Sequence, residues 1–273
     1  MKACWNGRND PGRSGGARAV RATSRWTSRW VVLALWAVTL HFSTSSATAR
    51  ADDVASEYRL TAFPTYPLGK TLTGFGYVGW VYKPDGNYDS VYLGTGTFIR
   101  PSEAVQLWGG LISVYTNSFD KSNTLELRPF VGVKFMGANS RKIRYYNWTR
   151  YELRLTDSLD TGDWTTVHRI RNQTRLEVPL ASAERAWTPK SWYLLADVEP
   201  IWRSDTGQID PLRLRAGVGH VASKRLLVEF QYYAQYTRPG EGGLEHTDNI
   251  FRVNLKIMTS KGVLSFLDGD FDD

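Results

Sequence analysis

Hydrophobic and polar residues alternate with a period of two along much of this chain, and the stretch from Pro211 to Thr237 shows the pattern most clearly. Alternation over such a length predicts β-strands with two unlike faces. A tight turn at Ser223-Lys224 separates the two predicted strands. One face carries Leu212, Leu214, Ala216, Val218, Leu226, Val228, Phe230, Tyr232, Ala234 and Tyr236, and the other includes Arg213, Arg215 and Glu229.

The same pattern predicts about ten strands in all. They cover approximately residues 71–83, 88–100, 103–116, 124–136, 141–156, 165–178, 191–203, 211–222, 225–237 and 248–259. Long polar connections alternate with tight turns, except that Ala181–Lys190 is long where a tight turn is expected. This zigzag predicts an all-β protein, an up-and-down antiparallel transmembrane β-barrel. Eight to twelve strands are compatible with the pattern, because strand boundaries predicted from sequence shift by several residues, and an even number would place both termini on one side.

One face of these strands collects ionised side chains, and we take it as a candidate lumen charge cluster. Lys134, Arg203 and Lys256 share this face, which makes thirteen Lys or Arg against six acids. The cluster comprises Glu126, Arg128, Arg144, Arg150, Glu152, Arg154, Arg169, Arg171, Arg175, Glu177, Asp197, Glu199, Arg213, Arg215, Glu229 and Arg252.

The alternation alone fits either a soluble barrel with an apolar core or a membrane barrel with a charged lumen. Two features favour the membrane barrel. The predicted strands are much longer than the usual length of about 5–6 residues in globular proteins. Tryptophan and tyrosine also lie near strand ends, as in the interfacial girdles of membrane barrels. These residues are Trp80, Tyr82, Tyr115, Trp164, Trp192, Trp202 and Tyr236.

Residues 1–51 have the pattern of a secretory signal peptide, which adds a compartment to the prediction. They hold eight Lys or Arg against one acid, then an apolar run from Trp30 to Phe42, then Ala49-Arg50-Ala51. A basic region, an apolar core and an A-x-A site predict cleavage near Ala51. The alternative, a membrane anchor, is disfavoured because the apolar run is shorter than the roughly 17–25 residues that span a bilayer.

The remaining chain is predicted to divide into an N-terminal periplasmic segment (52–70), the barrel (71–260) and an acidic C-terminal tail (261–273), located in a bacterial outer membrane. The whole chain has a formal net charge of +7, but most of this excess belongs to the leader. Nucleic-acid binding is therefore not expected. The single cysteine, Cys4, also lies in the leader, so neither disulfides nor thiolate metal sites are expected beyond it.

Three segments resemble the domain-of-unknown-function family 2490 of bacterial outer-membrane β-barrels. They are His168–Glu177 (HRIRNQTRLE), Leu212–Gly219 (LRLRAGVG) and Glu229–Tyr233 (EFQYY). The resemblance covers about residues 70–260. It implies a small outer-membrane barrel, and it implies no established activity and no catalytic residues.

The charge cluster has two interpretations. Arg–Glu and Arg–Asp ladders would fill and rigidify a narrow interior. The excess of positive charge would instead favour small anions or acidic glycans in a narrow pore. In both cases the expected partners are outer-membrane lipid and the outer-membrane assembly machinery.

Catalytic, metal-binding and cofactor-binding residues are not predicted. The spacings of His220 with Ser223 and of His246 with Asp248 are not diagnostic of a hydrolase, and the glycines from Gly74 to Gly96 form no phosphate loop. The leading hypothesis is a non-enzymatic outer-membrane barrel, either structural or a narrow anion-favouring pore. A lipid- or glycan-modifying barrel enzyme is the alternative, and a soluble periplasmic ligand-binding barrel is the second alternative.

Overall fold

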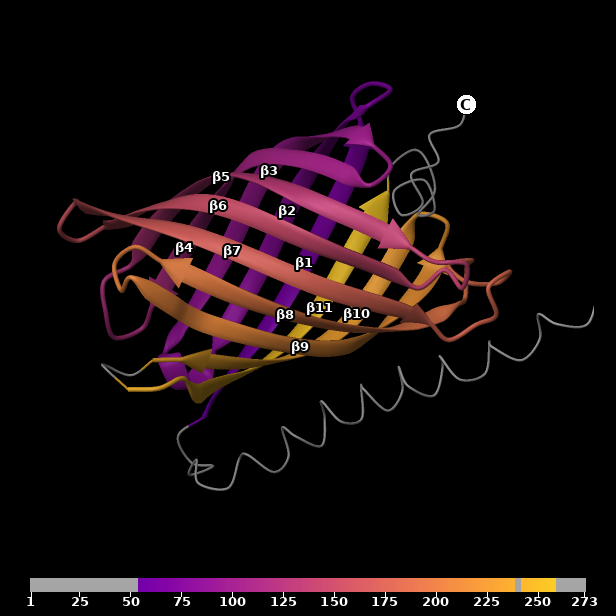
Figure 1. Cartoon of the computed structure of the whole chain (residues 1–273). Coiled ribbons are helices and arrows are strands. Elements are labelled where there is room, and N and C mark those ends of the chain that lie inside the picture. Colours follow the sequence, from indigo (N-terminus) through magenta and orange to yellow (C-terminus); the bar gives the residue numbers. More distant parts are fainter. Residues whose placement is uncertain (1–53, 239–241, 259–273) are drawn as a thin grey trace, which may run out of the picture. The chain divides into compact units, whose positions relative to one another are not determined.

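The computed structural model describes residues 54–238 and 242–258, which form a closed all-β barrel (Figure 1). The predicted signal peptide and acidic tail lie outside the described residues. No helix in the described part of the chain is long and apolar enough to cross a membrane. The strands are β1 (Ala55–Pro67), β2 (Leu72–Lys83), β3 (Tyr88–Ser102), β4 (Val105–Ser118), β5 (Thr124–Ala138), β6 (Arg144–Ser158), β7 (Asp163–Pro179), β8 (Trp192–Arg203), β9 (Gln208–Ser223), β10 (Leu226–Thr237) and β11 (Glu245–Met258), with a short 3-10 turn η2 (Pro84–Gly86).

Each strand pairs antiparallel with the next one in sequence, which confirms the predicted up-and-down barrel. The ten predicted strands correspond to β2–β11. The expectation of an even number is wrong, because the described residues contain eleven strands. With an odd number, the first and last strands run in the same direction. β1 therefore closes the barrel by parallel pairing with β11, from Ala55 opposite Asp248 to Thr65 opposite Met258.

β1 corrects the prediction that residues 52–70 precede the barrel. Its inward positions Glu57 and Thr61 are buried, whereas Tyr58 is exposed on the outer face, so the period-2 pattern is present. Pro64 and Pro67 hide this pattern in the sequence, because proline usually interrupts a strand. Gly76 of β2 makes room for Pro64, since a Cβ atom on Gly76 would lie 3.0 Å from Pro64 Cγ.

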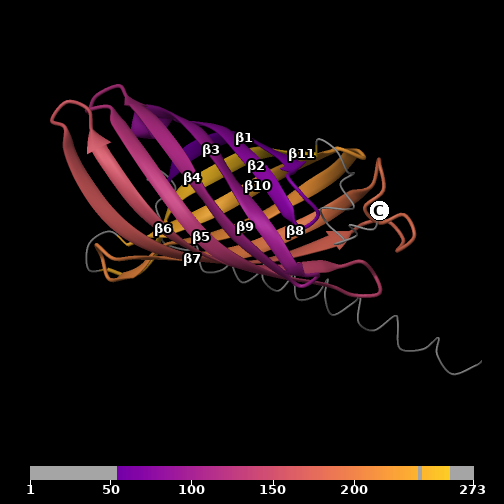
Figure 2. The same cartoon turned by 90° about the horizontal axis from the view of Figure 1, so that it is seen from above.

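The connections define two ends of the barrel. One end, which we call the long-loop end after the long polar loops predicted there, carries the connections at residues 84–87, 119–123, 159–162 and 204–207 and the connection from β10 to β11. The other end, which we call the short-turn end, carries those at 68–71, 103–104, 139–143, 180–191 and 224–225; only 103–104 and 224–225 are as tight as predicted, so the predicted alternation of long and tight connections holds only in part. The strands are strongly tilted between these ends, as the view in Figure 2 shows.

The long connection between β7 and β8 fills the lumen at the short-turn end. Trp187 is only 2 % exposed and belongs to an apolar cluster with Ala186, Tyr193, Leu195, Val221, Leu227 and Met258, which we call the end plug. The indole Nε1 of Trp187 donates a hydrogen bond to the carbonyl oxygen of Lys142 at 2.8 Å. The guanidinium of Arg144 stacks over the Trp187 ring, 3.5 Å from its centroid. The unexpected length of this connection is thus explained by the plug that it contributes.

Inside the barrel, a second apolar cluster covers the wall formed by β1–β6. It consists of Phe75, Phe98, Trp108 and Phe130, with Phe63, Ile112 and Trp148 packed against it, and we call it the aromatic wall. Gly96 on β3 permits this packing, because a Cβ atom there would lie 2.5 Å from Phe75 Cζ. Small residues opposite large rings are a common way to fill a narrow barrel.

The outer face of the barrel is apolar. Large side chains exposed on it include Leu60, Val78, Leu93, Leu111, Val131, Ile170, Leu194, Phe230 and Phe251. Aromatic side chains are exposed near both ends, with Trp80, Tyr82, Tyr115 and Trp202 towards the long-loop end and Tyr66, Tyr145 and Trp192 towards the short-turn end. The structure therefore resolves which face of the alternating strands points inward, and it is the charged one.

Candidate functional site

The predicted charge cluster lies inside the barrel. All sixteen of its residues occupy inward positions on β5–β11 and are buried or half-buried. The strand registers bring them together, as where Arg150 of β6 lies opposite Arg171 of β7 and Asp197 of β8 lies opposite Arg215 of β9. A slip of one residue in any of these strands would turn its charges to the outer face.

Each buried glutamate on β5, β6 and β8 is surrounded by arginines. Glu152 contacts Arg150 at 2.5 Å, Arg171 at 3.2 Å and also Arg169. Glu126 of β5 accepts hydrogen bonds from Arg128 and Arg154, with 2.6 Å between Nη2 and Oε2 in both cases. On β8, Glu199 contacts Arg171 at 2.6 Å, Arg215 at 3.2 Å and Arg213 at 3.7 Å.

Glu229 of β10 is the most enclosed carboxylate of the cluster, with an exposed fraction of 0 %. Its Oε1 atom accepts hydrogen bonds from Arg175 at 2.5 Å, from Tyr193 at 2.8 Å and from Lys256 at 2.6 Å. Its Oε2 atom accepts from Gln231 and Asn254 at 2.5 and 2.9 Å. Five donors thus compensate for the loss of water around this charge, which a buried carboxylate requires.

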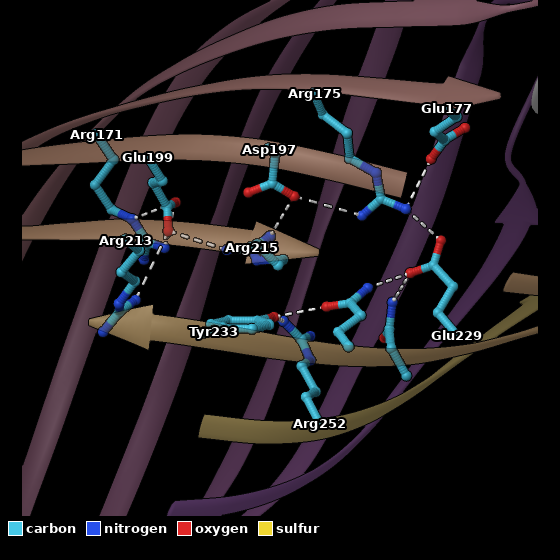
Figure 3. A network of polar contacts seen from close by, with 12 residues as sticks. Arg171, Arg175, Glu177, Asp197, Glu199, Arg213, Arg215, Glu229, Tyr233 and Arg252 are labelled. Carbon is cyan, nitrogen blue, oxygen red and sulfur yellow. Dashed lines mark hydrogen bonds and ion pairs between the residues drawn. The ribbon is translucent and has the colours of Figure 1, made fainter. Parts of the chain in front are cut away.

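These ion pairs join into one network that crosses the lumen (Figure 3). The links form because single arginines contact two or more carboxylates on different strands. Followed from one contact to the next, starting on β6 and ending on β11, the network consists of Glu152, Arg171, Glu199, Arg215, Asp197, Arg175, Glu229 and Lys256. The network connects strands that are not neighbours in the sheet, so it braces the barrel from within.

A cavity of about 500 Å³ lies in the lumen beside this network. Its lining reaches the long-loop end at Tyr88, Thr124 and Thr156, and the end plug does not contribute to it. The lining includes twelve of the sixteen predicted residues, whereas Arg144, Glu177, Asp197 and Glu229 are outside it. Thirteen Lys or Arg but only four acids line the cavity, and the four acids are Glu57, Glu126, Glu152 and Glu199. We call this cavity the cationic chamber.

A family model, described as protein of unknown function (DUF2490), matches residues 60–243. The chain belongs to this DUF2490 family. The matched region runs from β1 into the connection between β10 and β11, so it contains every cluster residue except Arg252. The family suspected from the sequence is therefore confirmed. No curated protein and no solved structure matches the chain.

Several interior polar residues of this DUF2490 barrel lie outside the cluster predicted from sequence. Glu57 and Arg59 of β1 form an ion pair in the lumen, and Lys83 of β2 pairs with Asp248 of β11. The first pair was missed because Pro64 and Pro67 obscure the alternation of β1 in the sequence. Tyr193 and Tyr233 also face inward, where Tyr193 donates to Glu229 and Tyr233 donates to Gln231 at 2.7 Å. Their positions follow from the alternation, but their partners do not.

The histidines of the DUF2490 barrel have packing contacts. His220 stacks on Trp192 with 4.2 Å between ring centroids, and its Nδ1 atom has no hydrogen-bond partner among the described residues. His246 packs against Tyr236 with 5.3 Å between tilted rings, and its Nε2 atom lies 3.2 Å from the backbone oxygen of Asp248. His168 Nδ1 lies 2.6 Å from the hydroxyl of Tyr151 on the outer face. In the described ranges, no group of three or more His, Cys, Asp and Glu side chains is arranged to hold a metal ion.

Proposed function

We propose that this DUF2490 barrel spans a bacterial outer membrane as a non-enzymatic protein with a rigid, ion-paired interior. The observation that carries the proposal is the polarity of the two faces. Charges line the lumen, while Val131 and Phe230 on the outside are 60 % and 49 % exposed. Exposure of this apolar surface to water would be unfavourable for a soluble barrel, whereas the hydrocarbon core of a bilayer accommodates it.

The aromatic side chains on the outer face support the same proposal. Trp80 and Tyr82 near the long-loop end stack with 6.0 Å between ring centroids, and Trp192 is exposed near the opposite end. Tryptophan and tyrosine favour the interface between headgroups and hydrocarbon, because their rings are amphipathic. Two such girdles, separated by an aliphatic band, are typical of membrane-spanning barrels.

Within this proposal, a structural barrel is favoured over an open pore. The end plug occupies the lumen at the short-turn end, and Arg–Glu pairs occupy much of the rest. A narrow anion-favouring pore is the second candidate, which the excess of positive charge in the cationic chamber supports. That pore would require the connection at residues 180–191 to move out of the lumen.

Membrane fractionation and gel migration of the full chain test the proposal. We expect the chain to leave the outer-membrane fraction only with detergent, and to migrate differently on gels before and after boiling. Release by salt or alkali alone would contradict it and support the soluble ligand-binding barrel. Planar-bilayer recordings separate a structural barrel from a pore. Hydrolysis of phospholipid or lipid A by the purified chain would contradict the non-enzymatic proposal and support the barrel enzyme.

A further inference from the structure

The cationic chamber has two chemically different walls. The aromatic wall, which β1–β6 provide, contributes Phe63, Phe75, Ile112, Trp108, Phe130 and Trp148 to its lining. The ion-pair network lies on the other side, on β6–β11. Arg150 joins the walls, since its guanidinium lies 4.6 Å from the Trp148 ring centroid and 2.5 Å from Glu152. The chamber therefore offers both charged and apolar surface to one ligand.

Two cations of the chamber are not neutralised by a carboxylate. Lys134 Nζ lies 3.8 Å above the ring centroid of Tyr146, and Arg252 donates to Thr61 Oγ1 and to the Tyr233 hydroxyl at 2.9 and 2.8 Å. Neither side chain has an ion pair with any carboxylate in the described part of the chain. A half-buried, unpaired cation attracts an anion more strongly than a surface lysine does, because water screens it less.

Lys134 adjoins the aromatic wall directly. It lies opposite Trp148 in the register of β5 and β6, and opposite Gln106 in the register of β4 and β5. An anionic group bound to Lys134 would therefore place an attached apolar group against Trp148, Trp108 and Phe130. The volume of about 500 Å³ lies within the range of roughly 300–1,000 Å³ that is usual for small-molecule sites.

We propose that the cationic chamber binds a small organic anion, in which a carboxylate, sulfonate or phosphate ester carries an aromatic body. The anionic group contacts Lys134, and the body packs against the aromatic wall. The closed barrel forms the chamber by itself, so the inference does not depend on insertion in a membrane. It goes beyond the proposed function by naming the ligand class and the contacts that select it.

Calorimetric titration of the full chain in nonionic detergent tests the inference, with 2-naphthyl phosphate as probe. Inorganic phosphate and 2-naphthol carry the two halves of the probe separately. We expect 2-naphthyl phosphate to bind at least about tenfold more tightly than either half, because burying its rings adds a hydrophobic contribution. Equal affinity for inorganic phosphate, or absence of binding by 2-naphthyl phosphate, would overturn the inference.

Substitutions at Lys134 locate the site. We expect Lys134→Gln to weaken binding of 2-naphthyl phosphate about tenfold, which is the usual effect of losing one charged hydrogen bond. Lys134→Arg keeps the charge and should retain most of the affinity. Lys224→Gln removes the same charge from an exposed turn and should leave the affinity unchanged. Equal affinities for Lys134→Gln and Lys224→Gln would overturn the inference.

Gel migration separates this inference from the proposed function. A chain that shows heat-modifiable migration and detergent-only extraction but binds no probe refutes the ligand class and keeps the membrane barrel. A chain that is released without detergent refutes the membrane barrel, whatever it binds.

Discussion

Arg175 and Glu229 form an ion pair across the lumen, with 2.5 Å between Nη2 and Oε1, although they are 54 positions apart in sequence. They lie on β7 and β10, which β8 and β9 separate in the sheet. The pair therefore spans the interior instead of linking adjacent strands. Both side chains are buried, so neither charge can be compensated by bulk water if its partner is removed.

We expect Glu229→Gln to destabilise the barrel by about 3–5 kcal/mol, because Glu229 is the shared counter-charge of Arg175 and Lys256, and only Arg175 keeps another close carboxylate, Glu177 at 2.8 Å. The measurement is the free energy of unfolding from denaturant titration in detergent micelles. Asp160→Asn removes a carboxylate from the exposed turn between β6 and β7 and should change the unfolding free energy by less than about 0.5 kcal/mol. Equal stability of the two variants would show that the network does not brace the barrel.

Gly219 is a second position where the interior tolerates little change. A Cβ atom on Gly219 would lie 2.0 Å from Cζ of Tyr193, whose hydroxyl donates to Glu229. We expect Gly219→Ala to displace the tyrosine ring and to cost about 1–3 kcal/mol of unfolding free energy, as overpacking usually does. Gly69→Ala is the matched control, since no atom lies within 4 Å of its Cβ position. A Gly219→Ala variant as stable as this control would contradict the close packing.

Trp187 controls whether the short-turn end is filled. We expect Trp187→Ala to raise the ionic conductance of the barrel in planar bilayers and to favour anions, because the chamber has excess positive charge. The matched control is Trp192→Ala, which removes an indole from the outer face. Each variant is first checked for heat-modifiable migration, because loss of a buried tryptophan costs about 3–5 kcal/mol. Unchanged conductance in a folded Trp187→Ala barrel would show that the end plug is not the barrier to ions.

Val131 on β5 distinguishes a membrane barrel from a soluble one. If the outer face of the barrel contacts lipid, Val131→Arg should lower the unfolding free energy in lipid vesicles by about 2–4 kcal/mol, which is the cost of an arginine near the bilayer midplane. Phe119→Arg lies in the connection between β4 and β5, where the side chain is 63 % exposed, and should have little effect. Equal effects at the two positions would argue against a lipid-facing surface.

The order of the strands could be predicted from this sequence, because local alternation and turn residues are sufficient to locate them. The membership of the charge cluster was predictable for the same reason, since one parity of each strand holds the charges from Glu126 to Arg252. β1 was not found, because Pro64 and Pro67 concealed its alternation. Because β1 was missed, the prediction of an even strand number was also wrong.

The sequence by itself determined which residues share a face, since side chains on a strand alternate with a period of two. Only the tertiary structure decided that the charged face is the interior, that β1 closes on β11 in parallel, and that Trp187 fills one end. The partners of the charges were also decided there. Arg175 meets Glu229 because the curvature of the closed sheet brings the inward side chains of β7 and β10 together over β8 and β9, and this curvature is not encoded locally.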